Sequence, residues 1–492
     1  MNQRLDQTQT PLLSALQAYA DRSYAAFHTP GHKRGQGMGR SLIHLLGAQA
    51  SRADLPELPE LDNLFAPRGV IHMAQALAAQ AFGAEQTWFL VNGSTSGVMA
   101  MMLATCNPGD KIILPRNVHQ SAISGLILSG AMPIFVQPEY DPEWDLAHGV
   151  TPAAIAAALT QHPDAKAVLV VYPTYYGTCS DLAAIAEITH QFNMPLLVDE
   201  AHGAHFAFHP EFPPSALVAN ADLTVQSTHK TLSALTQAAM LHRQGSRVDS
   251  DRISQALQLV QSTSPNYLLL AGLDAARHQM ATVGKELMAR TLQLADQARS
   301  RLSQIPGLDV LQAEQTALSG FWALDRTRLT VKITGLGIDG FTADEILHQQ
   351  LGVTCELPAL RHLTFILSLG NTAADIERLV QGFWQLTQVV EGGGEMGDKG
   401  DEGVGWQRLV GEMVMSPRHA WFAATELVEA EQAIARISAE LICPYPPGIP
   451  VLMPGERITA AAIDYLQQVL ASGGMISGCA DPDLKTLKVI TK

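Results

Sequence analysis

The sequence predicts an α/β protein with a doubly wound, mostly parallel seven-stranded sheet in its large domain and a smaller α+β domain after it. Short runs rich in Val, Ile and Leu recur between residues 87 and 243, with helix-like stretches between several of them. Continuously apolar runs of this kind are typical of strands buried on both faces. With 492 residues and 47% hydrophobic content, the chain has enough apolar surface for more than one core.

The strand pattern occurs seven times, at 87–93, 111–116, 132–137, 167–174, 195–203, 223–228 and 237–243. The stretches 151–162 and 182–192 have the composition expected of crossover helices between parallel strands. Ligands of doubly wound sheets sit at the carboxyl ends of the strands. Polar residues that follow these strands are therefore the candidates for function.

Three regions are expected along the chain. Residues 1–60 form an arm that contains the motif Pro-Gly-His-Lys, residues 61–305 form the large domain, and residues 306–492 form the smaller C-terminal part. The large domain should end in a mainly helical region over 250–305.

The C-terminal part differs from the large domain in the pattern of its predicted elements. Residues 328–333 and 363–369 are predicted strands, and the Gly-rich acidic stretch 391–405 is a predicted loop. An Ala- and Glu-rich segment, predicted to be helical, leads to 443–456, where five prolines impose an extended, turn-rich path.

The net charge and the cysteine content restrict the partners and the cellular compartment that we expect for this protein. A net charge of −15 and a pI near 5.5 argue against nucleic acid or an anionic membrane as a main partner. The five cysteines are scattered, with no CxxC pair, which is typical of reduced thiols. Neither a secretory signal nor an apolar run of membrane-spanning length is apparent. We expect a soluble, cytoplasmic protein.

Two residues at strand ends suggest a pyridoxal phosphate site. Lys230 follows an apolar strand, and a desolvated lysine loses its charge readily and can form a Schiff base. Asp199 ends the apolar run at 195–199, where a carboxylate needs a cationic partner such as the protonated cofactor ring nitrogen. The alternatives are a lysine that caps a strand, and an aspartate that caps a turn or binds a metal with His202 and His205.

Two further elements complete the pattern. Ser94, Thr95 and Ser96 lie where a strand gives way to an apolar helix, and free backbone amides there can bind a phosphate. His119 follows the next strand and can stack on an aromatic ring, although a structural histidine is the alternative. Lys230 comes 31 residues after Asp199 (230 − 199), which leaves room for one more strand and its connection. This order is typical of a fold-type-I pyridoxal phosphate enzyme.

The sequence resembles the Orn/Lys/Arg decarboxylases in their shorter bacterial form. The resemblance runs through nearly the whole chain, and its most specific motifs are "PGHK" and "PPGIPxxxPGE". The matching stretches are "FHTPGHKRG" (27–35), "NGSTSG" (92–97), "RNVHQSAISGLILSGA" (116–131), "PTYYGTCSDL" (173–182), "VDEAHGAHFAFHP" (198–210), "QSTHKTLSALTQ" (226–237), "STSPNYLLLAGLD" (262–274) and "YPPGIPVLMPGE" (445–456).

The resemblance implies a role for each site residue. Lys230 carries pyridoxal 5'-phosphate, Asp199 pairs with its ring nitrogen and His119 stacks on the ring. The phosphate is seated by Ser94, Thr95, Ser96, Ser227 and His229. His202 lies beside the ring, where the longer enterobacterial members have Trp. The catalytic set is then Lys230, His119, Asp199 and His229, with no metal. The resemblance also implies a homodimer or higher homo-oligomer, whose "PGHKRG" arm lies near the site and can come from the partner subunit.

The expected reaction is decarboxylation of a basic L-amino acid. Arginine is favoured, giving agmatine and CO2; lysine to cadaverine and ornithine to putrescine come next. These products belong to polyamine metabolism. Glu356 is a candidate partner for the substrate's cationic end, with an ordinary surface charge as the alternative. The rival functions are an aminotransferase, for which Arg361 could bind the α-carboxylate, and a non-catalytic regulatory relative.

Overall fold

A computed structural model of the chain describes residues 5–313, 320–392, 406–445 and 447–491. The chain divides into two compact units, a first unit of residues 1–104 with 197–288 and a second unit of residues 105–196 with 289–492. The predicted loop at 391–405 lies outside the described residues from position 393 onward. No described helix is long and apolar enough to cross a membrane.

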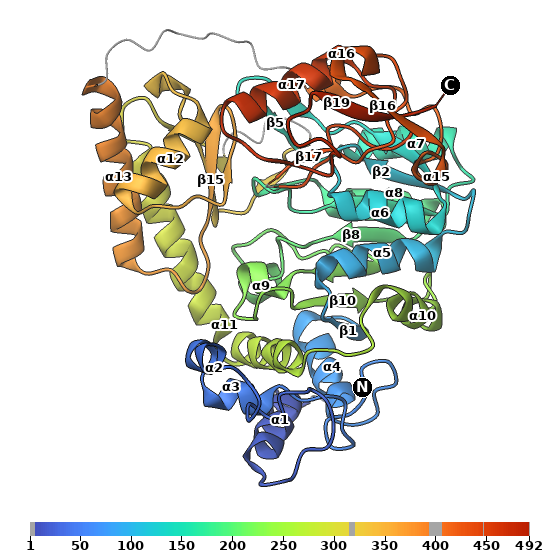
Figure 1. Cartoon of the computed structure of the whole chain (residues 1–492), viewed down its shortest axis with the longest axis vertical. Coiled ribbons are helices and arrows are strands. Elements are labelled where there is room, and N and C mark those ends of the chain that lie inside the picture. The colour runs from blue at the N-terminus through green and yellow to red at the C-terminus, as the bar shows by residue number, and fades with distance from the viewer. Residues whose placement is uncertain (1–4, 314–319, 393–405, 446, 492) are drawn as a thin grey trace. The chain divides into compact units, whose positions relative to one another are not determined.

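All seven predicted strands form, and they make one sheet in the order β1-β10-β9-β8-β6-β2-β3 (Figure 1). β2 runs parallel to β3 and β6, and β8 runs parallel to β9, whereas β10 is antiparallel to both β9 and β1. The predicted mostly parallel α/β fold is therefore confirmed. The strands are β1 (Gln86–Leu90), β2 (Lys111–Pro115), β3 (Met132–Val136), β6 (Ala167–Val171), β8 (Leu196–Asp199), β9 (Leu223–Gln226) and β10 (Ala239–Arg243).

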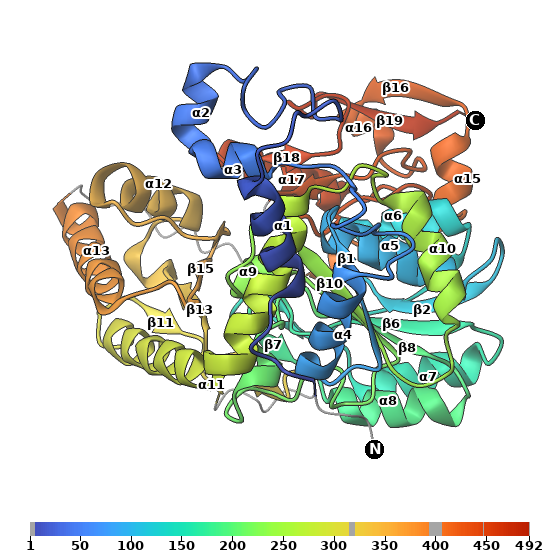
Figure 2. The ribbon, with the colours of Figure 1, turned by 90° about the horizontal axis from the view of Figure 1, so that it is seen from below.

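The first unit contains the N-terminal arm and the helices around β1, β9 and β10. Figure 2 shows α1 alongside the long helix α11, and a hydrogen bond of 3.0 Å from the Leu12 amide to Asp274 joins the two. The helices are α1 (Pro11–Asp21), α2 (Arg40–Leu46), α3 (Ala48–Ala53), α4 (Val70–Phe82), α5 (Gly93–Thr105), α9 (Thr228–Thr231), α10 (Ser250–Val260) and α11 (Tyr267–Leu302), which continues into the second unit.

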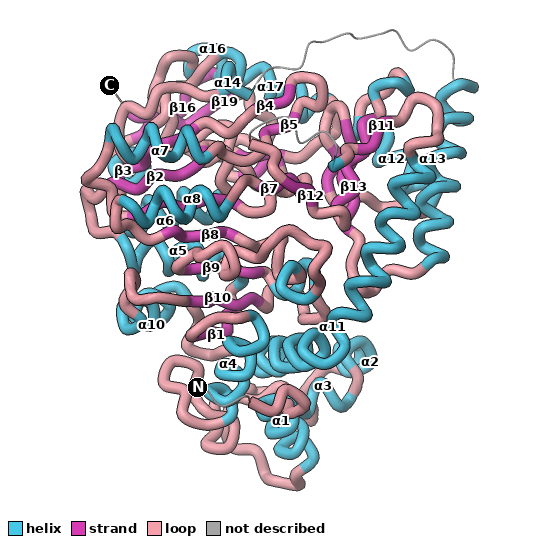
Figure 3. The backbone as a smooth tube through the Cα atoms, turned by 180° about the vertical axis from the view of Figure 1, so that it is seen from behind, coloured by secondary structure: helices cyan, strands magenta, loops and turns pink. Residues whose placement is uncertain are grey.

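The second unit contains β2, β3 and β6 with helices on both faces. α7 (Pro152–Gln161) and α8 (Leu182–Gln191) cover one face of these strands, as seen in Figure 3, and α6 (Gln120–Ser129) lies on the other, as seen in Figure 1. The two predicted crossover helices are thus confirmed. Short strands also form in this unit: β4 (Tyr140–Asp141), β5 (Leu146–Ala147) and β7 (Thr178–Cys179).

Two large hydrophobic cores lie among the described residues of the C-terminal part of the second unit. The first lies on the four-stranded sheet β11-β13-β15-β14, where Leu329, Leu363 and Phe383 are fully buried. The second contains Leu452, Leu466 and Val489. The elements around the first core are β11 (Asp309–Val310), β13 (Arg328–Lys332), α12 (Gly340–Leu351), β14 (Leu357–Pro358), β15 (His362–Ile366) and α13 (Ala373–Gly392). Those around the second are α14 (Trp406–Leu409), β16 (Thr425–Glu429), α16 (Ala430–Ala433), β17 (Cys443–Pro444), α17 (Ala460–Ala471), β18 (Ile476–Ser477) and β19 (Thr486–Ile490). β12 (Ala323–Leu324) pairs with β7, and α15 (Pro417–Phe422) packs on α6.

One secondary-structure prediction is wrong. The Ala- and Glu-rich segment before residue 443 is not a continuous helix, because it is broken into short helices and the strand β16. β16 pairs antiparallel with β19, with Thr425 opposite Ile490. The partner strand lies more than fifty positions further along the chain, so the pairing that overrides local helix propensity is not visible in the segment itself.

Candidate active site

Lys230 lies in the short helix α9, directly after β9, and its side chain is half-buried. Its Nζ is 3.0 Å from Nε2 of His202, which follows β8 on the neighbouring parallel strand. The two side chains are brought together because the carboxyl ends of parallel strands meet at one edge of a sheet. The amine is therefore held in a fixed direction inside the first unit.

Asp199 is the last residue of β8, and only 7% of its surface is exposed. Its Oδ1 accepts a hydrogen bond of 3.1 Å from the Ala201 amide. Burial raises the pKa of Asp199, and the charge of Lys230 opposes that rise. The carboxylate is thus buried at a strand end where a cation would stabilise its charged form.

His229 is held in one tautomer. Its Nδ1 lies 2.9 Å from the Ala238 carbonyl oxygen, so Nδ1–H donates and Nε2 is left as an acceptor. Burial lowers the pKa of His229, and the nearby charge of Lys230 acts in the same direction. The imidazole is therefore neutral at pH 7.

The predicted phosphate seat is the first turn of α5. The Ser227 hydroxyl donates to the Ser94 hydroxyl over 2.7 Å, which joins the end of β9 to the start of this helix. Thr95 is exposed. Ser96 is buried, and its hydroxyl donates to the Gly93 carbonyl over 2.8 Å. Ser94 and Thr95 therefore offer hydroxyls at this helix end, whereas the Ser96 hydroxyl closes the turn and the buried Ser227 hydroxyl supports Ser94.

The sequence analysis missed the residues that hold this turn in place. The Val91 amide donates to Oε1 of Gln261 over 2.9 Å, and the Ser262 amide donates to Oδ1 of Asn92 over 3.1 Å. Gln237 donates to the Val91 carbonyl. The matching stretch 262–274 begins with Ser262 of the second contact, but the partner of Ser262, Asn92, is 170 positions away in the sequence.

Gly97 allows α5 to approach the sheet closely. A Cβ atom at this position would lie 2.4 Å from Cγ2 of Val225 and 2.8 Å from Cδ1 of Leu90. Both distances are far below van der Waals contact, so any side chain here would push the helix away from β1 and β9. The glycine in "NGSTSG" thus sets the position of the hydroxyls before it.

The alternative that Asp199 binds a metal ion with His202 and His205 can be compared with the surroundings of these side chains. The His205 ring packs edge-on against Phe206 and Phe212, and Glu200 is fully buried with hydrogen bonds to Gln226 and the Ala216 amide. Among the described residues, no group of three or more His, Cys, Asp or Glu side chains is placed to hold a metal ion.

His119 belongs to the second unit, unlike the other residues predicted to hold the cofactor. It caps the N-terminus of α6, where its Nδ1 accepts from the Ser121 amide over 3.2 Å and lies 2.9 Å from the Ser121 hydroxyl. With Nδ1 as the acceptor, the proton resides on Nε2. The ring is thus held from one side by its own helix.

Glu356 also lies in the second unit, on a pocket of 590 Å³. Its Oε1 accepts a hydrogen bond of 2.5 Å from the Tyr175 hydroxyl, and the pocket is also lined by Asp344, Glu345 and Tyr465. Burial raises the pKa of Asp145, and the charge of Arg361 opposes that rise. Glu356 is thus an exposed carboxylate that is hydrogen-bonded to Tyr175, and the Asp145 carboxyl lies close enough to Arg361 to interact with its charge.

Comparison with solved structures defines the fold. The structure of the Francisella novicida lysine decarboxylase superposes with a TM-score of 0.84 at 22% identity, over 98% of this chain and 81% of that one. The structure of the constitutive lysine decarboxylase of Escherichia coli superposes with a TM-score of 0.82, also at 22% identity, over 99% of this chain and 82% of that one. The chain has the fold of these decarboxylases.

Sequence comparison identifies the family. The Orn/Lys/Arg decarboxylase major domain matches residues 10–329, and the C-terminal domain of the same family matches residues 406–481. The arginine decarboxylase of Bacillus subtilis is 40% identical over 489 residues, which is 99% of both chains. That of Bacillus anthracis is 39% identical, over 99% of this chain and 98% of its own. The chain belongs to the Orn/Lys/Arg decarboxylase family, and the predicted family and enzyme class are confirmed.

Proposed function

We propose that this enzyme is an arginine decarboxylase that uses pyridoxal 5'-phosphate and forms agmatine and CO2. The observation that carries the cofactor assignment is the buried carboxylate of Asp199 at one strand end, with the amine of Lys230 at the next. The preference for arginine is supported by the near-full-length relatives at about 40% identity, which are arginine decarboxylases. Lysine and ornithine are the next candidate substrates.

The residues of the first unit suit this cofactor. Lys230 would hold it covalently, Asp199 would keep a proton on its ring nitrogen, and the α5 turn with Ser94 and Ser227 would receive its phosphate. His202 is within hydrogen-bond distance of the Lys230 amine. We assign His119 to ring stacking, as the resemblance implies. Thr95, Ser96 and His229 complete the set of residues that we propose to hold the cofactor.

When bound, pyridoxal phosphate supplies an electron sink for the electron pair left behind as the α-carboxylate departs as CO2. The protein residues orient the substrate and control protons. Asp199, in its anionic form, would stabilise the positive charge on the ring nitrogen. One proton must then replace the lost CO2 at Cα. Lys230 is the proposed donor, and His202 at 3.0 Å can exchange a proton with it.

A product assay tests the proposal. Purified enzyme with pyridoxal phosphate receives arginine, lysine and ornithine in equal amounts, and the amines formed are identified by mass. We expect agmatine to dominate. A dominant cadaverine or putrescine signal would retain decarboxylation and change the substrate, whereas keto-acid formation without any amine would favour the aminotransferase alternative.

We further propose that the enzyme is a cytoplasmic homodimer. In the N-terminal arm, α2 buries none of its residues, Phe27 is 92% exposed and Leu45 is 79% exposed. Exposed apolar side chains gathered in one segment are typical of an interface, and a second copy of the chain is the proposed partner. Light scattering should give twice the chain mass, and Leu45→Glu should shift the equilibrium toward the monomer. A wild-type monomer at micromolar concentration would overturn this assignment.

A further inference from the structure

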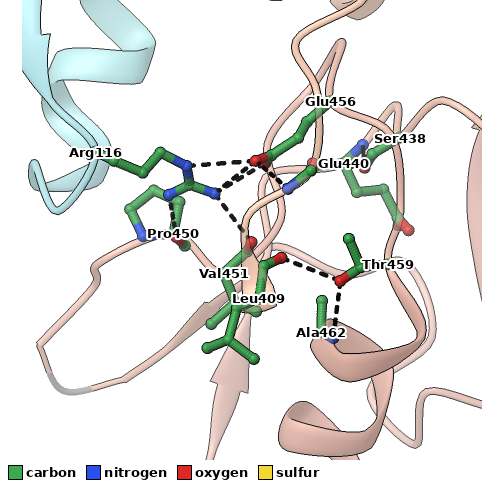
Figure 4. A network of polar contacts seen from close by, with 10 residues as sticks. Arg116, Leu409, Ser438, Glu440, Pro450, Val451, Glu456, Thr459 and Ala462 are labelled. Atoms are coloured by element: carbon green, nitrogen blue, oxygen red, sulfur yellow. Dashed lines mark hydrogen bonds and ion pairs between the residues drawn. The ribbon is translucent and has the colours of Figure 1, made fainter. Parts of the chain in front are cut away.

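A buried ion pair connects the end of β2 to the proline-rich segment near the C-terminus. Arg116, with 1% of its side chain exposed, donates to both carboxylate oxygens of Glu456, which is equally buried (Figure 4). The guanidinium also donates to the Pro450 carbonyl over 2.7 Å and to the Val451 carbonyl over 3.1 Å. One side chain therefore anchors three points of the segment 450–456.

The same segment touches His119, three residues after Arg116. The Gln120 amide donates to the Gly448 carbonyl over 3.0 Å. Gly448 has φ = +83°, and a Cβ atom there would lie 3.2 Å from Nε2 of His119 and 3.1 Å from Nε2 of Gln120. The backbone of Gly448 therefore lies against the edge of the imidazole, because no side chain intervenes.

His119 is thus constrained from two sides. Its own helix fixes Nδ1 through the Ser121 amide, and the C-terminal segment limits the movement of the edge that carries Nε2. A buried ion pair contributes little net stability, because desolvation of the charges offsets their attraction. Its more specific effect here is geometric, since it fixes the path of the chain that carries Gly448.

We propose that the segment 447–456 is a positioning element of the active site: the Arg116–Glu456 pair holds Gly448 against His119 and so fixes the orientation of the imidazole. Its consequence for the reaction rests on the proposed stacking of His119 on the cofactor. This role accounts for one of the two most specific motifs of the sequence, "PPGIPxxxPGE", which supplies both Gly448 and Glu456.

The test compares two glycine-to-alanine variants of the full-length enzyme. Gly448→Ala places a methyl group against the His119 ring, whereas Gly473→Ala places one at φ = +85° with no atom within 4 Å. Both variants carry the same backbone strain, and both glycines lie in the C-terminal domain. Only the first should raise the cofactor dissociation constant, by roughly 10-fold, as expected for a catalytic group displaced by a fraction of an ångström.

A second readout needs no cofactor. In the cofactor-free enzyme labelled at histidine nitrogens, the His119 ring resonances should shift in Gly448→Ala and stay in place in Gly473→Ala. In a His119→Ala background, Gly448→Ala should add nothing to the loss of cofactor affinity. If Gly448→Ala does not fold, Glu456→Gln replaces it, because the amide keeps the shape while removing the charge that pairs with Arg116.

The outcomes separate this inference from the proposed function. Equal effects of the two glycine variants on the resonances and on cofactor affinity would overturn the positioning role. An additive effect of Gly448→Ala in the His119→Ala background would do the same. A wild-type enzyme that binds no cofactor would instead overturn the proposed function, and the resonances would still test whether Gly448 orients His119.

Discussion

Lys230 and His202 face each other across the ends of two parallel strands, with 3.0 Å between Nζ and Nε2. Neither residue is in the strand itself: His202 lies in the turn after β8, and Lys230 lies in the short helix α9 after β9. The contact exists because β8 and β9 are neighbours, so a register shift in this pair would separate the two side chains. The sheet thus determines the direction in which the amine points.

Lys230→Ala should abolish the visible absorption of bound cofactor, because the covalent link requires this amine. Activity should fall below detection in the same preparation. Lys285→Ala, at an exposed position of α11, is the matched control and should keep both properties. Absorption spectra of the dialysed proteins provide the measurement. An unchanged spectrum in Lys230→Ala would rule out this lysine as the attachment point.

Asp199→Asn should lower the activity without lowering the stability of the cofactor-free protein. The amide oxygen can still accept from Ala201, but it cannot stabilise a positive charge, so kcat should fall by about 10²–10³-fold. Burial raises the pKa of Asp199, which means that folding disfavours the charged carboxylate. The melting temperature of the cofactor-free variant should therefore stay equal or rise. A loss of both activity and melting temperature would point to a structural role instead.

The sequence predicts those elements of the fold and of the site that are determined by neighbouring residues in the chain. The seven strands of the large sheet are recognisable because most of them are continuous apolar runs, and Lys230 and Asp199 stand out as charged residues at the ends of such runs. Contacts between distant segments are not predictable in this way. The amide of Val91 meets Gln261, and Arg116 meets Glu456, only after folding brings together positions 170 and 340 residues apart.

The same limit explains the wrong helix before residue 443, whereas the hydrogen bond of the Ser96 hydroxyl is local. Thr425–Glu429 becomes a strand because β19 offers it a partner. Ser96 shares its residue type and loop with Ser94, yet its hydroxyl bonds to Gly93 within the turn. Residue type alone does not distinguish a hydroxyl that faces a ligand from one that caps its own helix.

Acidification should destabilise the fold through His242. This imidazole is fully buried, lies 2.8 Å from the Thr87 hydroxyl and 3.1 Å from Oε1 of Gln226, and has its pKa lowered by burial to about 3. Between pH 3 and 6.5 the unfolded chain therefore binds a proton that the folded chain does not. Stability rises with pH across this window and is lost as pH falls through it.

Urea unfolding of the wild type and of His242→Gln at pH 7 and pH 5 measures this effect. The variant should lose about 2 kcal/mol less than the wild type between these pH values, at about 1.4 kcal/mol per pKa unit. Glu200, whose pKa burial raises to about 8, acts in the opposite sense, since its contribution is lost as pH rises. That contribution is common to both proteins. Equal pH dependence in both would contradict the assignment.

Removal of the Arg277 charge should detach the N-terminus from α11. Arg277 pairs with Asp274, both are fully buried, and the Asp274 carboxylate accepts from the Leu12 and Leu13 amides at the start of α1. The guanidinium also donates to the Gln7 carbonyl over 3.0 Å and to the Gln9 carbonyl over 2.8 Å. Arg277→Met leaves an uncompensated buried carboxylate, so the free energy of unfolding should fall by about 3–5 kcal/mol.

Arg301→Met is the matched control, because Arg301 lies on the same helix in an ion pair with Glu377 that is nearly half-exposed. Its loss should cost at most about 1 kcal/mol. Hydrogen exchange of residues 7–21 should accelerate in Arg277→Met and remain unchanged in Arg301→Met. The double variant Arg277→Met with Asp274→Asn should be less destabilised than the sum of the two single changes, because it leaves no buried charge. Additive losses would show that the two side chains stabilise α1 independently.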